Sequence, residues 1–294
     1  MSVFRARNWS EAEQARLKEL AITEPITLFG LNEQVLRLAA FASAFVVFSL
    51  LEALFPRRNR RLGRLARWFT NGAMLVIATG LVRVLAFAAP LVALTAAAGF
   101  AAELGFGLLN VVTLPIWIEI LLAIALLDLA VWFQHLITHK VPLLWRLHRV
   151  HHADRDFDAS TALRFHPVEI ALSALYKIVV VMILGPAAIA AVLFEITLNA
   201  TALFNHANLA LPRWLDRILR LVLVTPDMHR VHHSVNPSEL NTNFGFCLSI
   251  WDRMFGTYTA QPRDGHEAMT IGLAPYQSEP TEQLRWSLFL PFSK

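Results

Sequence analysis

Four long apolar runs constrain the fold of this chain more than any other feature. They are separated by polar or charged segments and cover residues 31–55, 71–102, 105–133 and 169–204. A helix needs about twenty apolar residues to cross the hydrocarbon core of a bilayer. A hydrophobic fraction of 56%, a charged fraction of 16% and a mean hydropathy of +0.49 agree with membrane insertion. The sequence therefore predicts an all-α integral membrane protein with about four to five transmembrane helices.

Two of these runs leave the number of spans open. The run 71–102 is too long for one upright span and contains Pro90, so a kinked helix fits it, as does a span followed by a re-entrant piece. The run 169–204 is interrupted at Gly185-Pro186 and is long enough for a hairpin of two short spans. We expect Glu119, at membrane depth, to bind a neighbouring helix.

A cluster of arginines between the first two runs predicts the orientation. Beside membrane spans, such a cluster marks the cytoplasmic side more simply than it indicates nucleic-acid binding. Its members are Arg57, Arg58, Arg60, Arg61, Arg64 and Arg67. We therefore expect a multi-pass protein, in the inner membrane if the cell is bacterial, that does not bind nucleic acid.

Histidines are concentrated in one third of the chain. Ten of the eleven lie between positions 135 and 233, and the pentapeptide His-Arg-Val-His-His occurs at 148–152 and again at 229–233. Imidazole is the commonest neutral metal ligand, so clustered histidines favour a metal site. Cys247 is the only cysteine, which excludes a disulfide framework or a cysteine-ligated iron–sulfur cluster. His266 is expected to be a solvated loop residue.

The spacing of the histidines places them on helices. His135 and His139 are four residues apart and share one helix face. A short interfacial helix is expected over 143–154, with its three histidines on one side and Arg146 and Arg149 pointing towards lipid headgroups. Nine or ten imidazoles are too many for one ion, but they suit two ions with about four or five nitrogens each.

The combined motifs resemble the fatty acid hydroxylase and sterol desaturase superfamily of membrane histidine-rich di-iron oxygenases. The resemblance covers roughly residues 125–260 and extends to Asp128. It rests on H-x3-H at 135–139, H-x2-H-H at 148–152 and 229–233, Arg-Phe-His-Pro at 164–167, Asn205-His206, Asn-Phe-Gly at 243–245 and Trp-Asp-Arg-Met-Phe-Gly-Thr at 251–257.

The resemblance implies a cytosolic, histidine-rich helical cap over two iron ions, which zinc can replace in purified protein. The implied metal ligands are His135, His139, His148, His151, His152, His206, His229, His232 and His233. Asp128 and Asn205 are expected to fix ligand rings by hydrogen bonds, with a buried structural hydrogen bond as the alternative for Asp128. His166 is expected either to ligate or to lie near the metals or substrate.

Other positions near the motifs are expected to be structural. Asn243 is interpreted as a turn residue. Trp251, Asp252 and Arg253 are expected to provide packing and an ion pair in the cap.

The implied function is hydroxylation of a lipid C–H bond, on a fatty acyl chain, a sterol or a related lipid. Desaturation by the same iron chemistry is the alternative, and a metal transporter or a bis-histidine haem protein is less favoured. Because the sequence shows no dinucleotide fingerprint and no cysteine cluster, electrons must come from a separate ferredoxin or from a cytochrome with its reductase. An acidic carrier could dock on Arg146, Arg149, Arg213, Arg217 and Arg220, although the positive-inside rule explains these residues equally well.

The expected organisation has four parts. An amphipathic segment (1–30) and an N-terminal transmembrane region (31–124) precede the catalytic region (125–260). A C-terminal tail (261–294) follows.

Overall fold

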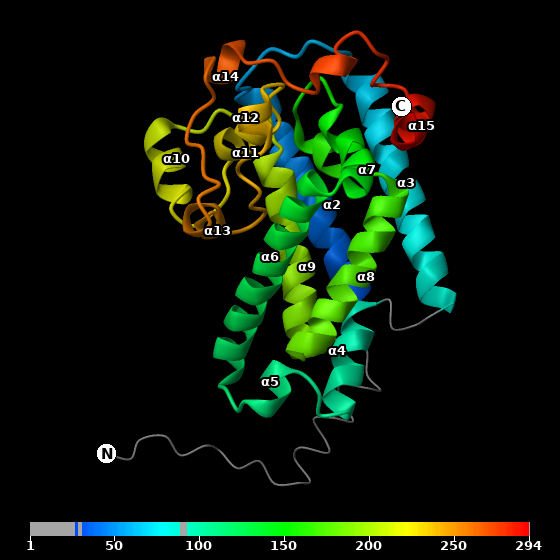
Figure 1. Ribbon diagram of the computed structural model, residues 1–294. Coiled ribbons are helices and arrows are strands. Elements are labelled where there is room, and N and C mark those ends of the chain that lie inside the picture. Colours follow the sequence, from blue (N-terminus) through cyan, green and yellow to red (C-terminus); the bar gives the residue numbers. More distant parts are fainter. Residues whose placement is uncertain (1–26, 29–30, 89–92, 294) are drawn as a thin grey trace.

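The computed structural model describes residues 27–28, 31–88 and 93–293 of the chain (Figure 1). The predicted amphipathic segment 1–30 therefore lies, apart from two residues, outside the described part. Thr27–Leu28 (β1) and Leu31–Asn32 (β2) pair as a short antiparallel ladder. The remaining named elements are helices, as the apolar runs predict.

Five long helices form the bundle that dominates the molecule (Figure 1). Their sequences are rich in apolar residues, and Asn32 begins the first of them by accepting a hydrogen bond from the Val35 amide. The five are α2 (Glu33–Leu54), α3 (Arg64–Ala88), α6 (Ile116–Lys140), α8 (Pro167–Leu184) and α9 (Ala188–Asn205).

The predicted break at Gly185-Pro186 is a tight turn between α8 and α9. Gly185 has a φ of +60°, and a Cβ at this position would lie 2.5 Å from the side-chain nitrogen of Asn110. Only glycine fits both the backbone angle and the space. The predicted hairpin is thus present, and it returns the chain to the end of the bundle where α8 began.

Among the described residues, six helical stretches are long and apolar enough to cross a membrane, whereas the sequence predicted four to five. Five are the continuous helices above. The sixth, Leu94–Val111, consists of α4 (Leu94–Glu103) and α5 (Leu108–Val111). A ten-residue helix such as α4 rises about 15 Å, roughly half of the hydrocarbon thickness. Whether residues 71–102 form a kinked helix or a span followed by a re-entrant piece stays a prediction.

Short helices gather at one end of the bundle and form a cap (Figure 1). They lie where α2, α6 and α9 end. The cap contains α7 (Pro142–His152), η2 (Ala159–Leu163), α10 (Arg213–Leu219), α11 (Pro226–His232), α12 (Pro237–Leu240), α13 (Ile250–Met254), α14 (Gly265–Ala268), η3 (Ala274–Tyr276), α15 (Leu284–Phe289) and η4 (Leu290–Phe292).

Ion pairs of the arginine cluster connect the N-terminal helices to this cap. Arg67 is fully buried, and its guanidinium donates to Asp154 at 2.8 Å and to Asp158 at 2.5 Å. Arg60 and Arg64 both donate to the buried Glu52 at 3.1 Å. Pairing with distant carboxylates, rather than contact with headgroups alone, explains why so many arginines occur together.

The C-terminal segment also packs on the cap. Leu290 forms a buried cluster with Met74 of α3 and with Val150 and Ala153 at the end of α7. The buried guanidinium of Arg164 donates to the Thr281 carbonyl at 2.6 Å. Residues 261–293 are therefore built into the same body as the cap.

Candidate metal centre

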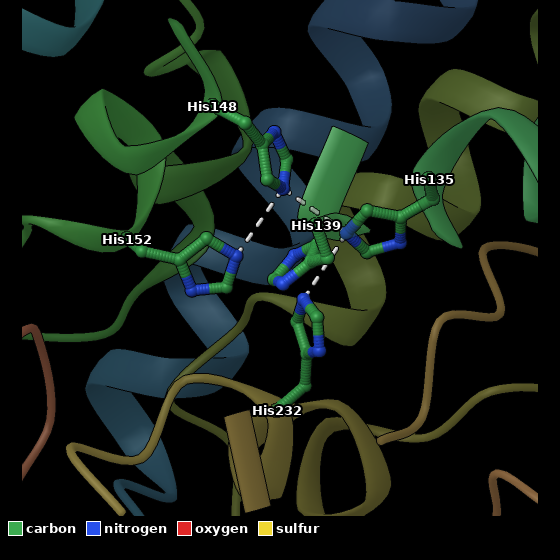
Figure 2. Close-up of side chains that lie close together, drawn as sticks. All are labelled: His135, His139, His148, His152 and His232. Atoms are coloured by element: carbon green, nitrogen blue, oxygen red, sulfur yellow. Dashed lines mark hydrogen bonds between the residues drawn. The ribbon is translucent and has the colours of Figure 1, made fainter. Parts of the chain in front are cut away.

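The nine histidines predicted as ligands lie together inside the cap, in two groups. Within each group, one potential ligand atom per residue lies within 4.8 Å of every other. Figure 2 shows the five rings of the first group pointing towards a common centre. The first group consists of His135, His139, His148, His152 and His232, and the second of His151, His206, His229 and His233.

The repeated pentapeptide supplies both groups at once. Successive residues of an α-helix point about 100° apart, so the adjacent His151 and His152 of α7 face different groups. In the second copy, at the end of α11, His232 joins the first group while His229 and His233 join the second. The prediction that the three histidines of α7 share one side is therefore refined, because they divide between two neighbouring centres.

Four of the rings are oriented by acceptors at Nδ1. His135 donates to the Phe244 carbonyl, His206 to the Ala202 carbonyl and His232 to the Thr242 carbonyl, each at 2.7 Å. The Nδ1 of His148 lies 2.6 Å from a carboxylate oxygen of Glu169. A carbonyl oxygen only accepts, so in a neutral ring the proton is on Nδ1 and Nε2 carries a lone pair.

These lone pairs face one another. The Nε2 of His135 lies 3.1 Å from the Nε2 of both His148 and His232, contacts drawn as dashed lines in Figure 2. With Nδ1 protonated in all three rings, no proton remains for a hydrogen bond between them. Nitrogens bound to one ion at about 2.1 Å lie about 3.0–3.4 Å apart in octahedral or tetrahedral geometry. The spacing therefore fits a cation shared by these rings.

Ring nitrogens of the second group also face one another. His206 Nε2 lies 3.1 Å from the Nε2 atoms of His151 and His229. His233 is fully buried, and neither of its ring nitrogens has a hydrogen-bond partner in the described part of the chain. A buried polar group without a partner is costly, so a ligand for this ring accounts for its position.

Burial favours the neutral form of six of these rings. It lowers the pKa of His232 to about 3 and that of His206 to about 4. Burial, followed by repulsion from neighbouring histidines, holds the pKa of His151, His152, His229 and His233 well below the usual value. Neutral imidazole is the form that binds metal, so at neutral pH these rings need not lose a proton first.

The three residues expected around the metals have other partners. Asp128 accepts hydrogen bonds from the amides of Cys247 and Leu248 and from the indole of Trp251, at 2.9–3.1 Å. Asn205 donates to the Phe246 carbonyl at 2.9 Å. Among the described hydrogen bonds, neither residue contacts a histidine ring. Both instead hold segment 246–251 against the bundle. For Asp128 this is the buried structural hydrogen bond that the sequence left open as the alternative.

His166 lies outside both groups, at the beginning of α8. Its Nδ1 accepts from the Val168 amide and its Nε2 faces the Leu288 carbonyl, both at 3.3 Å. Both ring nitrogens are therefore engaged in capping the helix and binding the C-terminal segment.

Two expectations about the cap are wrong. His266 is 4% exposed rather than solvated, and its Nε2 lies 3.0 Å from the side-chain oxygen of Gln261. Asp252 does not form an ion pair with Arg253. It is buried and accepts from the indole of Trp132 and from the Phe244 amide.

The structure also tests the expectations for Arg149 and Glu119. Arg149 donates to the Leu290 carbonyl at 2.6 Å, so it binds the C-terminal segment instead of pointing towards headgroups. Glu119 accepts from the Ala187 amide at the beginning of α9, which confirms its tie to a neighbouring helix.

Asn243 is confirmed as a turn residue, and its turn orients two rings of the first group. It has a φ of +53°, and its side chain is held by the Met228 carbonyl and by the backbone of Thr259. The carbonyls on either side of it, at Thr242 and Phe244, accept from His232 and His135. The Asn-Phe-Gly motif is the feature of the sequence from which this orienting role could have been predicted.

Glu169 was missed by sequence reasoning. It lies in the first turn of α8 and was seen only as the boundary of an apolar run. Its distance of 21 residues from His148 offered no local spacing that connects the two.

Comparison with known proteins agrees with this geometry. Residues 120–257 match the model of the fatty acid hydroxylase family, and this stretch contains every histidine of both groups. Through this region the chain resembles the fatty acid hydroxylase family. No solved structure matches the chain significantly.

Three curated relatives in the same superfamily illustrate its range. The alkylglycerol monooxygenase of Homo sapiens is 30% identical over 147 residues, which cover 48% of this chain and 30% of that protein. The ornithine lipid hydroxylase OlsE of Rhizobium tropici is 29% identical, over 51% of this chain and 44% of that protein. The cholesterol 25-hydroxylase of Homo sapiens is 28% identical, over 47% of this chain and 50% of that protein. The match thus spans half or less of each relative.

Proposed function

We propose that this protein is a membrane-bound di-iron oxygenase of the fatty acid hydroxylase family. It uses O2 and external electrons to hydroxylate a C–H bond of a lipid. The observation that carries the proposal is the pair of buried groups, of five and four histidines, in which several Nε2 atoms face one another at 3.1 Å. The relatives named above act, by their names, on an alkylglycerol, an ornithine lipid and cholesterol, which supports a lipid as the substrate.

The residues of the cap have separate roles in this proposal. The five-histidine group holds one iron and the four-histidine group holds the other. Iron bound to neutral nitrogens supplies the activation of O2 towards an unactivated C–H bond. The carbonyls of Ala202, Thr242 and Phe244, with the Glu169 carboxylate, hold the rings in the orientation that directs Nε2 inwards.

An apolar groove beside the metal centre supports a substrate with a hydrocarbon part. Its volume is about 680 Å³, and it runs along α6 and α8 between Leu126, Tyr176 and Phe255. Trp132 lines the groove and contacts Phe244 edge-on at 6.5 Å between ring centroids. The Phe244 carbonyl in turn accepts from His135, so Trp132 and Phe244 connect the groove to the first histidine group.

Electrons are proposed to come from a separate ferredoxin or from a cytochrome with its reductase, at the cytoplasmic face. Of the five arginines suggested for docking, Arg146, Arg213 and Arg217 are exposed. Arg149 is bound to the C-terminal segment, and Arg220 is buried against Asp216.

A desaturase of the same superfamily is the alternative, because removal of a second hydrogen would give an alkene. A metal transporter is less favoured, since its ligands would lie near mid-span, whereas these histidines lie in the cap at one end of the bundle (Figure 1).

The direct test supplies ¹⁸O2 to membranes containing the protein and an electron donor, followed by mass spectrometry of the lipids. Hydroxylation predicts one labelled oxygen in a lipid product, absent from a His232→Ala control. An unsaturated lipid without label would favour the desaturase. Unchanged lipids with every donor would contradict the oxygenase proposal.

A further inference from the structure

Helices α10 and α13 form a lobe at the side of the cap. We call residues 213–222 and 250–255 the α10–α13 lobe. The Ser249 amide donates to the Val222 carbonyl at 2.9 Å, and the Arg253 guanidinium donates to the Arg220 carbonyl at 2.6 Å. In Figure 1 the lobe stands beside α6, and α13 lies level with the upper part of that helix, nearer to the middle of the bundle than α11.

The outer face of the lobe is apolar. Trp214 and Ile218 are four residues apart on α10, and Ile250 and Met254 are four apart on α13, so each pair shares a helix face. With Leu221 and Phe255, these side chains are 45–67% exposed. Several large apolar side chains exposed on two neighbouring helices favour an interaction site.

This apolar face continues the surface of two membrane-spanning helices. The ring of Phe255 stacks on Trp132 of α6 with centroids 4.5 Å apart. Both residues line the apolar groove that also includes residues of α8. Helices α6 and α8 are candidate membrane spans, so the lobe begins where the lipid-facing surface of the bundle ends.

The charge of α10 distinguishes between possible partners. Arg213 and Arg217 are exposed on the helix, while its one acidic residue, Asp216, is buried and paired with Arg220. The exposed charge of α10 is thus positive, which complements anionic lipid headgroups. An acidic soluble protein would satisfy the arginines, but it would not account for a broad apolar face that continues the lipid-facing surface.

We propose that the α10–α13 lobe docks on the membrane, with its apolar side chains at the boundary of the acyl chains and Arg213 and Arg217 among anionic headgroups. The partner is the leaflet nearest the cap. This proposal concerns attachment of the cap to the bilayer and does not depend on the chemistry of the metal centre.

The test places a fluorophore on the lobe of the full-length protein. Ile218→Cys is labelled with an environment-sensitive dye, and the protein is reconstituted into vesicles of phosphatidylcholine or of an equal mixture of phosphatidylcholine and phosphatidylglycerol. Cys247 is buried, so the wild-type protein serves as the labelling control. Asp264→Cys is the matched control, at an exposed site beside α14, which lies at the top of the cap and further from the middle of the bundle than α10 and α13 (Figure 1).

We expect lipids with a shallow doxyl group to quench the dye at position 218 and not at 264, more strongly in the anionic vesicles. Each change Arg213→Gln or Arg217→Gln should lower the ratio of docked to undocked lobe about fivefold in anionic vesicles. Aqueous iodide quenching that is equal at both positions in both vesicles would overturn the proposal. So would protection of position 218 only after addition of an acidic redox protein.

Discussion

His148 differs from the other oriented rings of the metal centre in the group that fixes it. His135, His206 and His232 donate to main-chain carbonyls, whereas His148 lies against the Glu169 carboxylate. A carboxylate partner makes an imidazole ligand more basic than a carbonyl does. The other oxygen of Glu169 is buried without a partner among the described residues, so its whole carboxylate serves this one contact.

Replacing Glu169 with alanine is expected to weaken metal binding about 10–100-fold, because His148 loses the group that orients it. Glu169→Gln keeps an oxygen acceptor and should cause a smaller loss. Affinity is measured by competition with a chelator, and Glu267→Ala, at an exposed side chain, is the control. Wild-type affinity in Glu169→Ala would show that the contact does not support the metal.

His266 is expected to make folding stability depend on pH. Burial lowers its pKa to about 4, although Asp227 raises it and Arg230 lowers it further. In the unfolded chain its pKa is about 6.5. Between these values the unfolded state binds the extra proton, so stability is complete above about pH 6.5 and falls by at most about 3 kcal/mol as the pH drops towards 4.

The measurement compares thermal unfolding of wild-type protein and His266→Gln in detergent at about pH 7 and about pH 5. The glutamine can still donate to Gln261 but does not titrate, so the variant should lose less stability on acidification. An equal loss in both proteins would contradict this assignment.

At the scale of elements, the sequence predicted what depends on local spacing. The H-x3-H and H-x2-H-H patterns contain eight of the nine histidines that the structure brings together, because helix geometry puts them on adjacent faces. The ninth, His206, was expected only from the family resemblance. The division into two groups depends on how α7 and α11 pack against each other, and the spacing of histidines in the sequence gives no information on that packing. The carbonyls that orient the rings were not predictable either, since every residue has one.

The arginine cluster shows the same limit for charge. The number of arginines in this short segment predicted only that the segment lies on the cytoplasmic side of the membrane. The partners of Arg67 lie 87 and 91 residues further along the chain, so no local pattern revealed the pairing. Asp154 and Asp158 flank the turn that follows α7, and Arg67 thereby connects α3 to the element that carries three of the histidines.

Arg67→Ala is expected to destabilise the protein by about 3–5 kcal/mol, because it leaves two buried carboxylates without their partner. Thermal unfolding in detergent measures the change. Arg263→Ala, at an exposed ion pair, should show no measurable effect. If the two variants unfolded alike, the connection between α3 and the cap would contribute little.

At the scale of the whole molecule, the two ends of the bundle differ in the residues and helices that they carry. The arginine cluster and all nine clustered histidines lie at the cap end, whereas α4 and α5 lie at the other (Figure 1). The arginines favour the cytoplasm for the cap.

Cysteines introduced at Asn59 and Ser238, both exposed in the cap, should react with a membrane-impermeant reagent only from the cytoplasmic side. A cysteine at Glu103, exposed at the end of α4, should react only from the opposite side. Labelling of Asn59 and Ser238 from different sides would be incompatible with this topology.

The metal content of folded, purified protein tests the central claim most directly. Two buried groups of five and four histidines predict about two ions per chain, iron in the working enzyme, with zinc able to replace it. His232→Ala and His229→Ala, one from each group, should each reduce the content to about one ion. His166→Asn keeps the helix cap and should retain both ions. One ion or none in folded wild-type protein would contradict the account.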